Sequence, residues 1–443
     1  MNPLRVRFVR HVAMTGGAQA VQAAAAMVAG IMVARVLGAD AKGTLSVLTA
    51  LGAMCMMLGS FGVQLSGVYF LGRFKSERDA VLSNNLLVAV VGGTLAAAAL
   101  ALVGVAFRHE VIPGIDVGLF LLFTLSVPFY YFNQFARSLL LGLGRVGRYN
   151  IPEALSGAAL LIGTASAILV FGEHLEPLIG LRIAIEVGVA ALVAVWVRRA
   201  ARFRWHPSLA MLKRQLAYGL RNYASSLLWM FLLQIDIVLC NHFLGNATTG
   251  IYSVAVSLGL PITMLAGIVG VLTFQRVSAE DSRPVRIAQT NRAARVLLPL
   301  AAVGIALIGL LAQWLIPLVY GQRFDPAGVA LLLLLPGFLV YSVEMVLMNF
   351  LAGEGSPPII VWAPLTGLAI NVVANLFVIP RWGINGASVT SSVAYGVVLL
   401  LVAQYYRRST GSSLRDTFVV RGSDLAGLLG RRGSSGRAEA QAA

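Results

Sequence analysis

Long apolar stretches separated by short polar loops run through this chain from one end to the other. A helix needs about 20 mostly apolar residues to cross the hydrocarbon core of a bilayer. Twelve stretches qualify, at residues 12–34, 45–71, 86–107, 117–141, 151–172, 177–197, 216–243, 251–274, 293–318, 328–351, 359–379 and 386–406. The pattern therefore predicts an all-α, polytopic membrane protein with about twelve transmembrane helices.

A phrase of the sequence occurs twice, at an offset of 207 residues. It reads LGADAKGTLSVLTALG at 37–52 and LGNATTGIYSVAVSLG at 244–259, and a weaker match links Gly-x-Gly at 142–144 with Gly-x-Gly at 353–355. Because six helices is an even number, the two halves must be parallel in topology. Two repeated halves are typical of a transporter with two bundles around a central cavity.

The apolar stretches divide the chain into four expected parts. These are an N-terminal six-helix bundle over 1–200, a cytoplasmic interfacial elbow over 201–215, a C-terminal six-helix bundle over 216–408 and a disordered cytoplasmic tail over 409–443. The elbow interleaves apolar residues such as Trp205 with Arg and Lys. This fits either a segment lying on an anionic leaflet or an ordinary basic loop. The tail is predicted to be disordered because it has little apolar content.

The distribution of basic residues predicts the orientation. The chain is 58% hydrophobic and 12% charged, and its 34 Lys and Arg against 18 Asp and Glu give a net charge of +16. Most of the basic residues lie at the N-terminus, in alternate loops and in the tail. The opposite loops hold only Arg35, Lys42, Arg108, Arg323 and Arg381. The positive-inside rule then puts both termini in the cytoplasm, and short basic loops between spans argue against nucleic acid as a partner.

The sequence carries no pattern that suggests an enzyme, a cofactor or a metal site. It has no phosphate-binding loop, no spaced His/Cys set and only 5 His. Cys55 and Cys240 both lie in apolar stretches, where packed core thiols are expected. Without a nucleotide site, transport would be driven by an ion gradient or by the concentration of the substrate.

Short motifs, most of them Gly, Pro and Asn residues at predicted helix ends, follow one another along the chain. They are ARVLG at 34–38, QIDIVL at 234–239, LVYG at 318–321, NVVAN at 371–375 and IPRWGINGA at 379–387. In this order and spacing they resemble the polysaccharide branch of the multidrug/oligosaccharidyl-lipid/polysaccharide exporter superfamily, the Wzx-type oligosaccharide flippases. The resemblance covers nearly the whole chain.

The resemblance implies two six-helix bundles forming a V, with a cavity lined mainly by helices 1, 2, 7 and 8. It implies that an undecaprenyl-diphosphate-linked oligosaccharide moves from the cytoplasmic to the outer leaflet of the bacterial inner membrane, for lipopolysaccharide or exopolysaccharide biosynthesis. The implied partners are the lipid-linked oligosaccharide, membrane lipids and the polysaccharide polymerase and chain-length machinery. The alternative on the same fold is a cation-coupled exporter of small amphipathic compounds. A membrane polymerase or ligase is disfavoured because every outer loop is short.

Cationic side chains within or beside the predicted spans are candidates for substrate binding, because an ionisable group in the membrane costs at least about 2.5–3.5 kcal/mol on insertion scales. Arg35 and His242 occupy equivalent positions in the two repeats, near the outer helix ends. They fit either a diphosphate site or snorkelling to the interface. Arg221 and Arg137 lie near inner helix ends and present the same two alternatives.

Acidic side chains within the spans are candidates for ion coupling. Asp236 lies about eight residues from the outer end of its helix, which puts it near the middle of the bilayer. Glu344 is a second, deeply placed carboxylate. Arg182 and Glu186 are four residues apart on one helix, so we expect them to form a structural ion pair.

Overall fold

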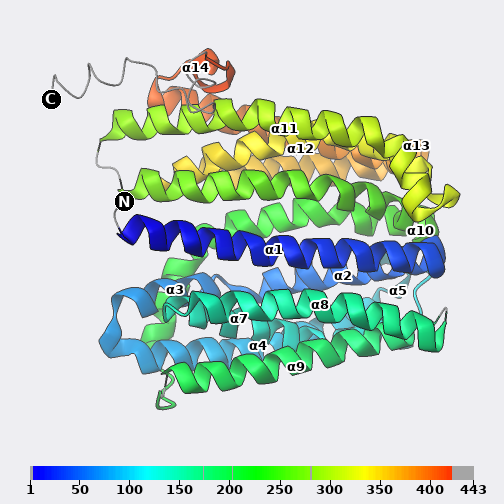
Figure 1. Cartoon of the computed structure of the whole chain (residues 1–443), viewed down its shortest axis with the longest axis horizontal. Coiled ribbons are helices and arrows are strands. Elements are labelled where there is room, and N and C mark those ends of the chain that lie inside the picture. Colours follow the sequence, from blue (N-terminus) through cyan, green and yellow to red (C-terminus); the bar gives the residue numbers. More distant parts are fainter. Residues whose placement is uncertain (1–2, 173, 202, 280–281, 422–443) are drawn as a thin grey trace. The chain divides into compact units, whose positions relative to one another are not determined.

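The structure, a computed structural model, describes residues 3–172, 174–201, 203–279 and 282–421, and all regular structure in these ranges is helical. The helices, labelled in Figure 1 where there is room, are α1 (Pro3–Val36), α2 (Gly38–Ser60), α3 (Val63–Arg73), η1 (Lys75–Glu77), α4 (Arg78–Ala106), α5 (Arg108–Val111), α6 (Val117–Thr124), α7 (Val127–Gly142), α8 (Val146–Phe171), α9 (Glu176–Ala201), α10 (Leu209–Ala279), α11 (Arg283–Tyr320), η2 (Gln322–Phe324), α12 (Pro326–Gly353), α13 (Ile359–Thr410) and α14 (Leu414–Phe418).

The helices account for the predicted membrane spans. Among the described residues, ten helical segments are long and apolar enough to cross a bilayer. Two of them, Tyr223–Met264 and Ile359–Thr410, contain 42 and 52 residues, far more than one crossing needs. Each is interrupted by a glycine outside the helical conformation, Gly245 with φ 78° and Gly383 with φ 58°. Division at these glycines gives the twelve spans, and the all-α polytopic fold is confirmed.

The chain packs into two compact units. Unit 1 comprises residues 1–257, 313–330 and 371–387, and unit 2 comprises 258–312, 331–370 and 388–443. Helices α10, α11, α12 and α13 each contribute residues to both units. The expected division into bundles over 1–200 and 216–408 remains a prediction.

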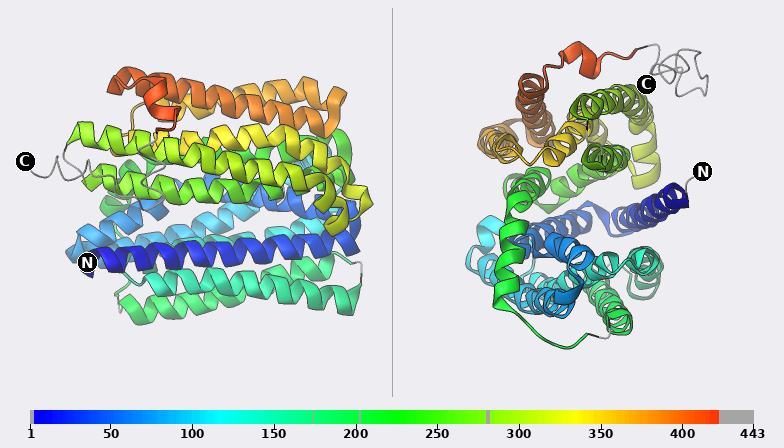
Figure 2. Two further views of the ribbon diagram at one scale, coloured as in Figure 1. Left: turned by 45° about the horizontal axis from the view of Figure 1, so that its top comes forward. Right: turned by 90° about the vertical axis from the view of Figure 1, so that its left-hand side faces the viewer.

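Within unit 1, α1 lies along α8, and α8 lies along α9 (Figure 2). Small residues allow the close packing of α1 and α8, since a Cβ on Gly157 would lie 2.8 Å from the Cα of Gln22. Large apolar side chains, among them Leu102, Leu169 and Leu310, remain exposed on the helices. In a membrane these surfaces contact lipid tails, so they need no protein cover.

The segment before α10 is held by side chains of α4. The backbone N–H groups of Arg204, His206 and Ser208 donate to Asp79 at 3.2 Å, Ser83 at 2.8 Å and Asn84 at 3.0 Å. Trp205, between these anchored positions, is 58% exposed. The segment is therefore fixed to α4 through its backbone and leaves an aromatic side chain exposed, and its position at the membrane interface stays a prediction.

The first part of the expected disordered tail has a defined structure. Ser413 and Asp416 form a reciprocal capping box at the start of α14, which satisfies backbone donors that a short helix leaves open. The buried side chain of Thr417 donates to Asn291 of α11 at 3.2 Å. These tertiary contacts order residues 409–421 despite their polar composition, and residues 422–443 lie outside the described ranges.

Candidate functional site

The two copies of the repeated phrase contact each other inside unit 1. Gly43 of α2 and Gly250 of α10 occupy equivalent positions, and a Cβ on either one would lie 2.9 Å from the backbone nitrogen of the other. A Cβ on Gly43 would also overlap the carbonyl group of Asn246, and one on Gly250 would overlap that of Ala39. Residues 39 and 246 are themselves repeat equivalents. The contact is therefore reciprocal, as across a local two-fold axis, and only glycine allows it.

A second close approach joins the same parts of the chain. Gly62, between α2 and α3, packs on Gly219 of α10 so that a Cβ on either would lie 2.6 Å from the carbonyl oxygen of the other. The Tyr223 hydroxyl donates to the carbonyl of Met57 beside this contact. Gly43 and Gly62 are 19 residues apart, which is about 28 Å along a helix, close to the thickness of the hydrocarbon core. The two contacts thus lie near opposite ends of one membrane crossing.

Asp236 forms a buried acidic site on α10. Its side chain is 1% exposed, and its Oδ2 accepts a hydrogen bond of 2.5 Å from the hydroxyl of Tyr252. Its Oδ1 accepts from the backbone N–H of Ile237 at 2.8 Å. Asp236 and Tyr252 belong to the two limbs of α10 on either side of Gly245. The carboxylate therefore joins both limbs, and protonation of Asp236 would change this joint.

Three polar side chains of α10 bind the backbone of residues 110–114. Asn241 donates to the carbonyl of Pro113 at 3.2 Å, and Asn246 donates to that of Gly114 at 2.9 Å. The His242 Nδ1 lies 3.1 Å from the carbonyl of Glu110. His242, predicted as a substrate ligand, is exposed and takes a backbone partner. It helps to hold α10 against α5, next to the loop that Asn241 and Asn246 bind.

Arg35 also binds main-chain carbonyls. Its guanidinium donates to Leu318 at 2.7 Å and to Val319 at 3.1 Å, in the last turn of α11. A helix C-terminus leaves carbonyls without helical partners and carries partial negative charge, so a guanidinium stabilises it. Arg35 and His242 are equivalent in the repeats, yet each binds a different backbone segment.

Arg137 is buried in an ion pair. Its guanidinium contacts the carboxylate of Glu153, donates to the carbonyl of Tyr149 at 3.3 Å and lies 5.2 Å from the centre of the Tyr149 ring. These contacts join α7 to α8. The structure thus gives Arg137, a predicted substrate ligand, an acidic, a main-chain and an aromatic partner within the protein.

The predicted pairing of Arg182 with Glu186 differs from what the structure contains. Arg182 donates to the hydroxyl of Thr49 at 3.1 Å, whereas the Glu186 carboxylate accepts from Asn133 at 2.7 Å. Both residues lie on α9, but α2 and α7 supply closer polar partners than their own helix does. Each of the two side chains therefore binds a residue of another helix, and the structural ion pair between them stays a prediction.

Comparison with known proteins identifies the family. The family model described as "Polysaccharide biosynthesis protein" matches residues 8–274. The chain belongs to the polysaccharide biosynthesis protein family. It is 22% identical over 202 residues to the probable low-salt glycan biosynthesis flippase Agl15 of Haloferax volcanii, and the match spans 45% of this chain and 43% of that protein. This confirms the resemblance drawn from the motifs.

Solved transporters share the fold of this polysaccharide biosynthesis protein. The lipid II flippase MurJ in an inward closed conformation aligns with a TM-score of 0.70 and 14% identity, covering 92% of this chain and 89% of that one. An inward-facing multidrug resistance MATE family transporter of the MOP superfamily aligns with a TM-score of 0.68 and 15% identity, covering 88% and 94%. The two neighbours are a lipid flippase and a multidrug transporter, so the fold alone does not choose between these substrates.

Glu344 and Arg221 are the two remaining residues of the predicted site. Glu344 of α12, in unit 2, is 1% exposed, and its Oε1 has no hydrogen-bond partner among the described residues. The side chain of Arg221 lies outside the described residues, so its predicted role is open. In the part of the chain that the structure describes, no three His, Cys, Asp or Glu residues come together as a metal site would require.

Sequence reasoning missed the hydrogen-bond partner of Asp236. Tyr252 lies within the second repeat copy, but its first-copy equivalent is Leu45, so the phenol is specific to one half. Comparing the two copies for polar differences would have singled it out. The same comparison would have singled out Asn246, which replaces Ala39.

Proposed function

We propose that this protein is a flippase that moves an undecaprenyl-diphosphate-linked oligosaccharide from the cytoplasmic to the outer leaflet of a bacterial inner membrane. The observation that carries the proposal is the family match over residues 8–274, which includes both copies of the repeat. The similarity to a probable glycan biosynthesis flippase supports it. Both termini lie in the cytoplasm under this proposal, and no catalytic step is involved.

The physical task of such a protein is to keep the diphosphate and the sugars out of hydrocarbon. An isolated buried ion costs tens of kcal/mol in idealised calculations, so the path must offer polar groups throughout. Buried polar side chains inside the spans of unit 1, such as Asp236, Tyr252 and Asn241, fit this requirement. Arg221 is the cation that we propose for the diphosphate, because it lies on α10 close to Gly219.

Deletion of the gene tests the proposed substrate. We expect one lipid-linked oligosaccharide to accumulate on the cytoplasmic face of the inner membrane, where an impermeant glycosidase added to intact spheroplasts cannot reach it. The wild-type gene should restore surface polysaccharide. A glycan that reaches the outer leaflet at the normal rate in the deletion strain would contradict the proposal. The polysaccharide polymerase and chain-length machinery would act after this step.

The second candidate is a cation-coupled exporter of small amphipathic compounds. The likeness to a MATE transporter and the two buried carboxylates, Asp236 and Glu344, favour it. It predicts that deletion sensitises cells to cationic dyes and leaves the surface glycan intact. The flippase proposal predicts the reverse, so one strain tested in both assays separates them.

A further inference from the structure

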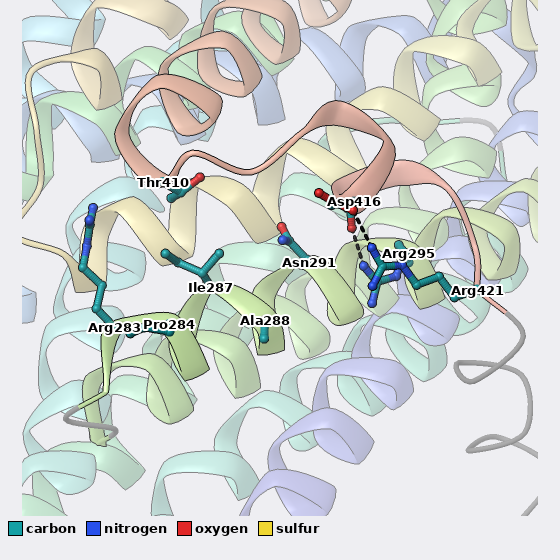
Figure 3. A pocket seen from close by; sticks show the side chains of 9 residues that line it. All are labelled: Arg283, Pro284, Ile287, Ala288, Asn291, Arg295, Thr410, Asp416 and Arg421. Carbon is teal, nitrogen blue, oxygen red and sulfur yellow. Dashed lines mark hydrogen bonds and ion pairs between the residues drawn. The ribbon is translucent and has the colours of Figure 1, made fainter. Parts of the chain in front are cut away.

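Unit 2 contains a cavity of about 560 Å³ at the start of α11 and the end of α13 (Figure 3). Helix α11 contributes Arg283, Asn291 and Arg295, and the segment around α14 closes the cavity with Asp416 and Arg421. The cavity is far larger than one water needs. It could therefore take a small ligand or the head group of a lipid.

The lining is strongly cationic. Among the described lining residues, three arginines face one carboxylate, that of Asp416. Arg295 is only 7% exposed and donates to the main-chain carbonyl of Asp416, while Arg421 contacts the carboxylate of the same residue. Figure 3 shows both guanidiniums converging on Asp416. Counted over the described lining residues, the arginines outnumber the carboxylates by two, and an anion is the matching ligand.

Arg283 lies at the other end of the cavity, and two contacts within the protein orient its guanidinium. Its Nε contacts Glu354 at 2.8 Å, and its NH2 donates to the carbonyl of Ser409 at 2.9 Å. Arg286 binds the second oxygen of Glu354 at 2.7 Å. One carboxylate thus serves two arginines, and the positive charge around the cavity is again in excess.

A network of hydrogen bonds around Asn291 joins the helices that line the cavity. Asn291 is 6% exposed, accepts hydrogen bonds from Tyr406 at 2.9 Å and from Thr417 at 3.2 Å, and donates to Ser412 at 3.2 Å. This network fixes α11, α13 and α14 to one another. The backbone segments that carry the arginines are therefore held in place before any ligand arrives, which lowers the entropy lost on binding.

We propose that this cavity binds a phosphate group, carried either by an anionic lipid of the cytoplasmic leaflet or by a soluble diphosphate. A guanidinium group binds phosphate through two parallel hydrogen bonds to two of its oxygens. Basic pockets between helices on the cytoplasmic side recognise lipid head groups. The cavity lies at the helix ends that the charge distribution assigns to the cytoplasm. The proposal does not depend on the transported substrate. Binding at this cavity can therefore be tested separately from the proposed flippase activity.

Calorimetric titration of the full-length protein in a zwitterionic detergent tests the site. One arm uses dihexanoyl phosphatidylglycerol as the probe, with dihexanoyl phosphatidylcholine as its zwitterionic control, and the other uses inorganic pyrophosphate. We expect saturable binding in at least one arm. Binding of the anionic lipid alone assigns the site to the leaflet, and binding of pyrophosphate assigns it to a soluble anion. Absence of saturable binding in both arms overturns the proposal.

Variants locate the binding in the cavity. The side chains of Arg283 and Arg421 are 48% and 55% exposed, so a double variant R283Q/R421Q should fold, which gel filtration checks. We expect about tenfold weaker binding from the loss of two charge-assisted contacts. Arg408→Gln is the matched control, because Arg408 is exposed at the same end of α13 and does not line the cavity. Equal weakening by both variants would overturn the site. If the double variant does not fold, the single variant Arg421→Gln applies the same test.

Discussion

Gly43 and Gly250, two positions related by the internal repeat, pack backbone against backbone. A repeat in sequence shows only that two segments share an ancestry and a local conformation. The reciprocal contact shows that they also meet, each glycine fitting against the partner copy. With the Gly62–Gly219 contact near the other end of the same crossing, the second span is closed against α10 at two levels. Under the proposed function, a large substrate that passes between these helices requires at least one of the contacts to open.

A valine at Gly43 is expected to prevent the closed contact. Its side chain would overlap the Asn246 carbonyl, so the two segments must separate. We expect flipping to fall at least tenfold. We also expect faster labelling of a cysteine at Asn246, a buried position, by an impermeant maleimide added outside. Gly188→Val on α9 is the control, because a Cβ there meets no atom within 4 Å. Unchanged labelling in Gly43→Val would show that the contact is not a gate.

The Arg137–Glu153 pair is expected to matter for stability rather than for substrate. Removing one member of a buried ion pair leaves an uncompensated charge, which costs about 3–5 kcal/mol. Arg137→Met should therefore lower the melting temperature of the purified protein strongly, and Glu153→Gln added to it should recover part of the loss. Activity per folded molecule should be near that of the wild type. An Arg137 variant that folds normally but does not transport would instead indicate that Arg137 binds the substrate.

The capping box of α14 is expected to depend on pH. Hydrogen bonds from the side chain and backbone of Ser413, together with the nearby Arg421, lower the pKa of Asp416. A lowered carboxyl pKa contributes stability above the unfolded pKa of about 3.9, and that stability is lost as the pH falls through the folded value. In a carboxyl-carbon NMR titration, Asp416 should therefore titrate at lower pH in the wild type than in Ser413→Ala. Identical titration curves for the two proteins would show that Ser413 does not lower the pKa of Asp416.

The orientation can be checked with reporter fusions after residues 75, 205 and 285. All three positions lie between the predicted spans, in segments that the distribution of Lys and Arg assigns to the cytoplasm. We expect each fusion to be inactive with a reporter that requires the periplasm and active with one that requires the cytoplasm. A periplasmic signal at any one of them would contradict the twelve-span topology.

The sequence predicted the membrane fold well because span length is set by the bilayer and is visible in hydropathy alone. The polar interactions were harder. Arg182 and Glu186 share a helix face, which local spacing favours, yet Thr49 and Asn133 from other helices bind them instead. Glu153 of α8 is the partner of Arg137 of α7, a pairing that local spacing does not reveal. Tertiary packing chooses among several chemically equivalent partners, and one sequence does not reveal that choice.

Variants of Asp236 test whether a buried carboxylate in unit 1 takes part in transport. If it exchanges a proton during transport, Asp236→Asn should lower flipping strongly, because an amide keeps the shape and cannot ionise. If it only accepts the hydrogen bond from Tyr252, the amide oxygen should serve nearly as well. Tyr252→Phe separates the two roles, since it removes the 2.5 Å hydrogen bond and leaves the carboxylate in place. Leaving a buried acceptor without this donor should cost about 1–3 kcal/mol of stability. We expect Asp236→Asn to be inactive at every external pH and Tyr252→Phe to be less stable but active, in proteoliposomes that contain the lipid-linked glycan. Wild-type flipping by Asp236→Asn across the pH range would remove this carboxylate from the transport cycle.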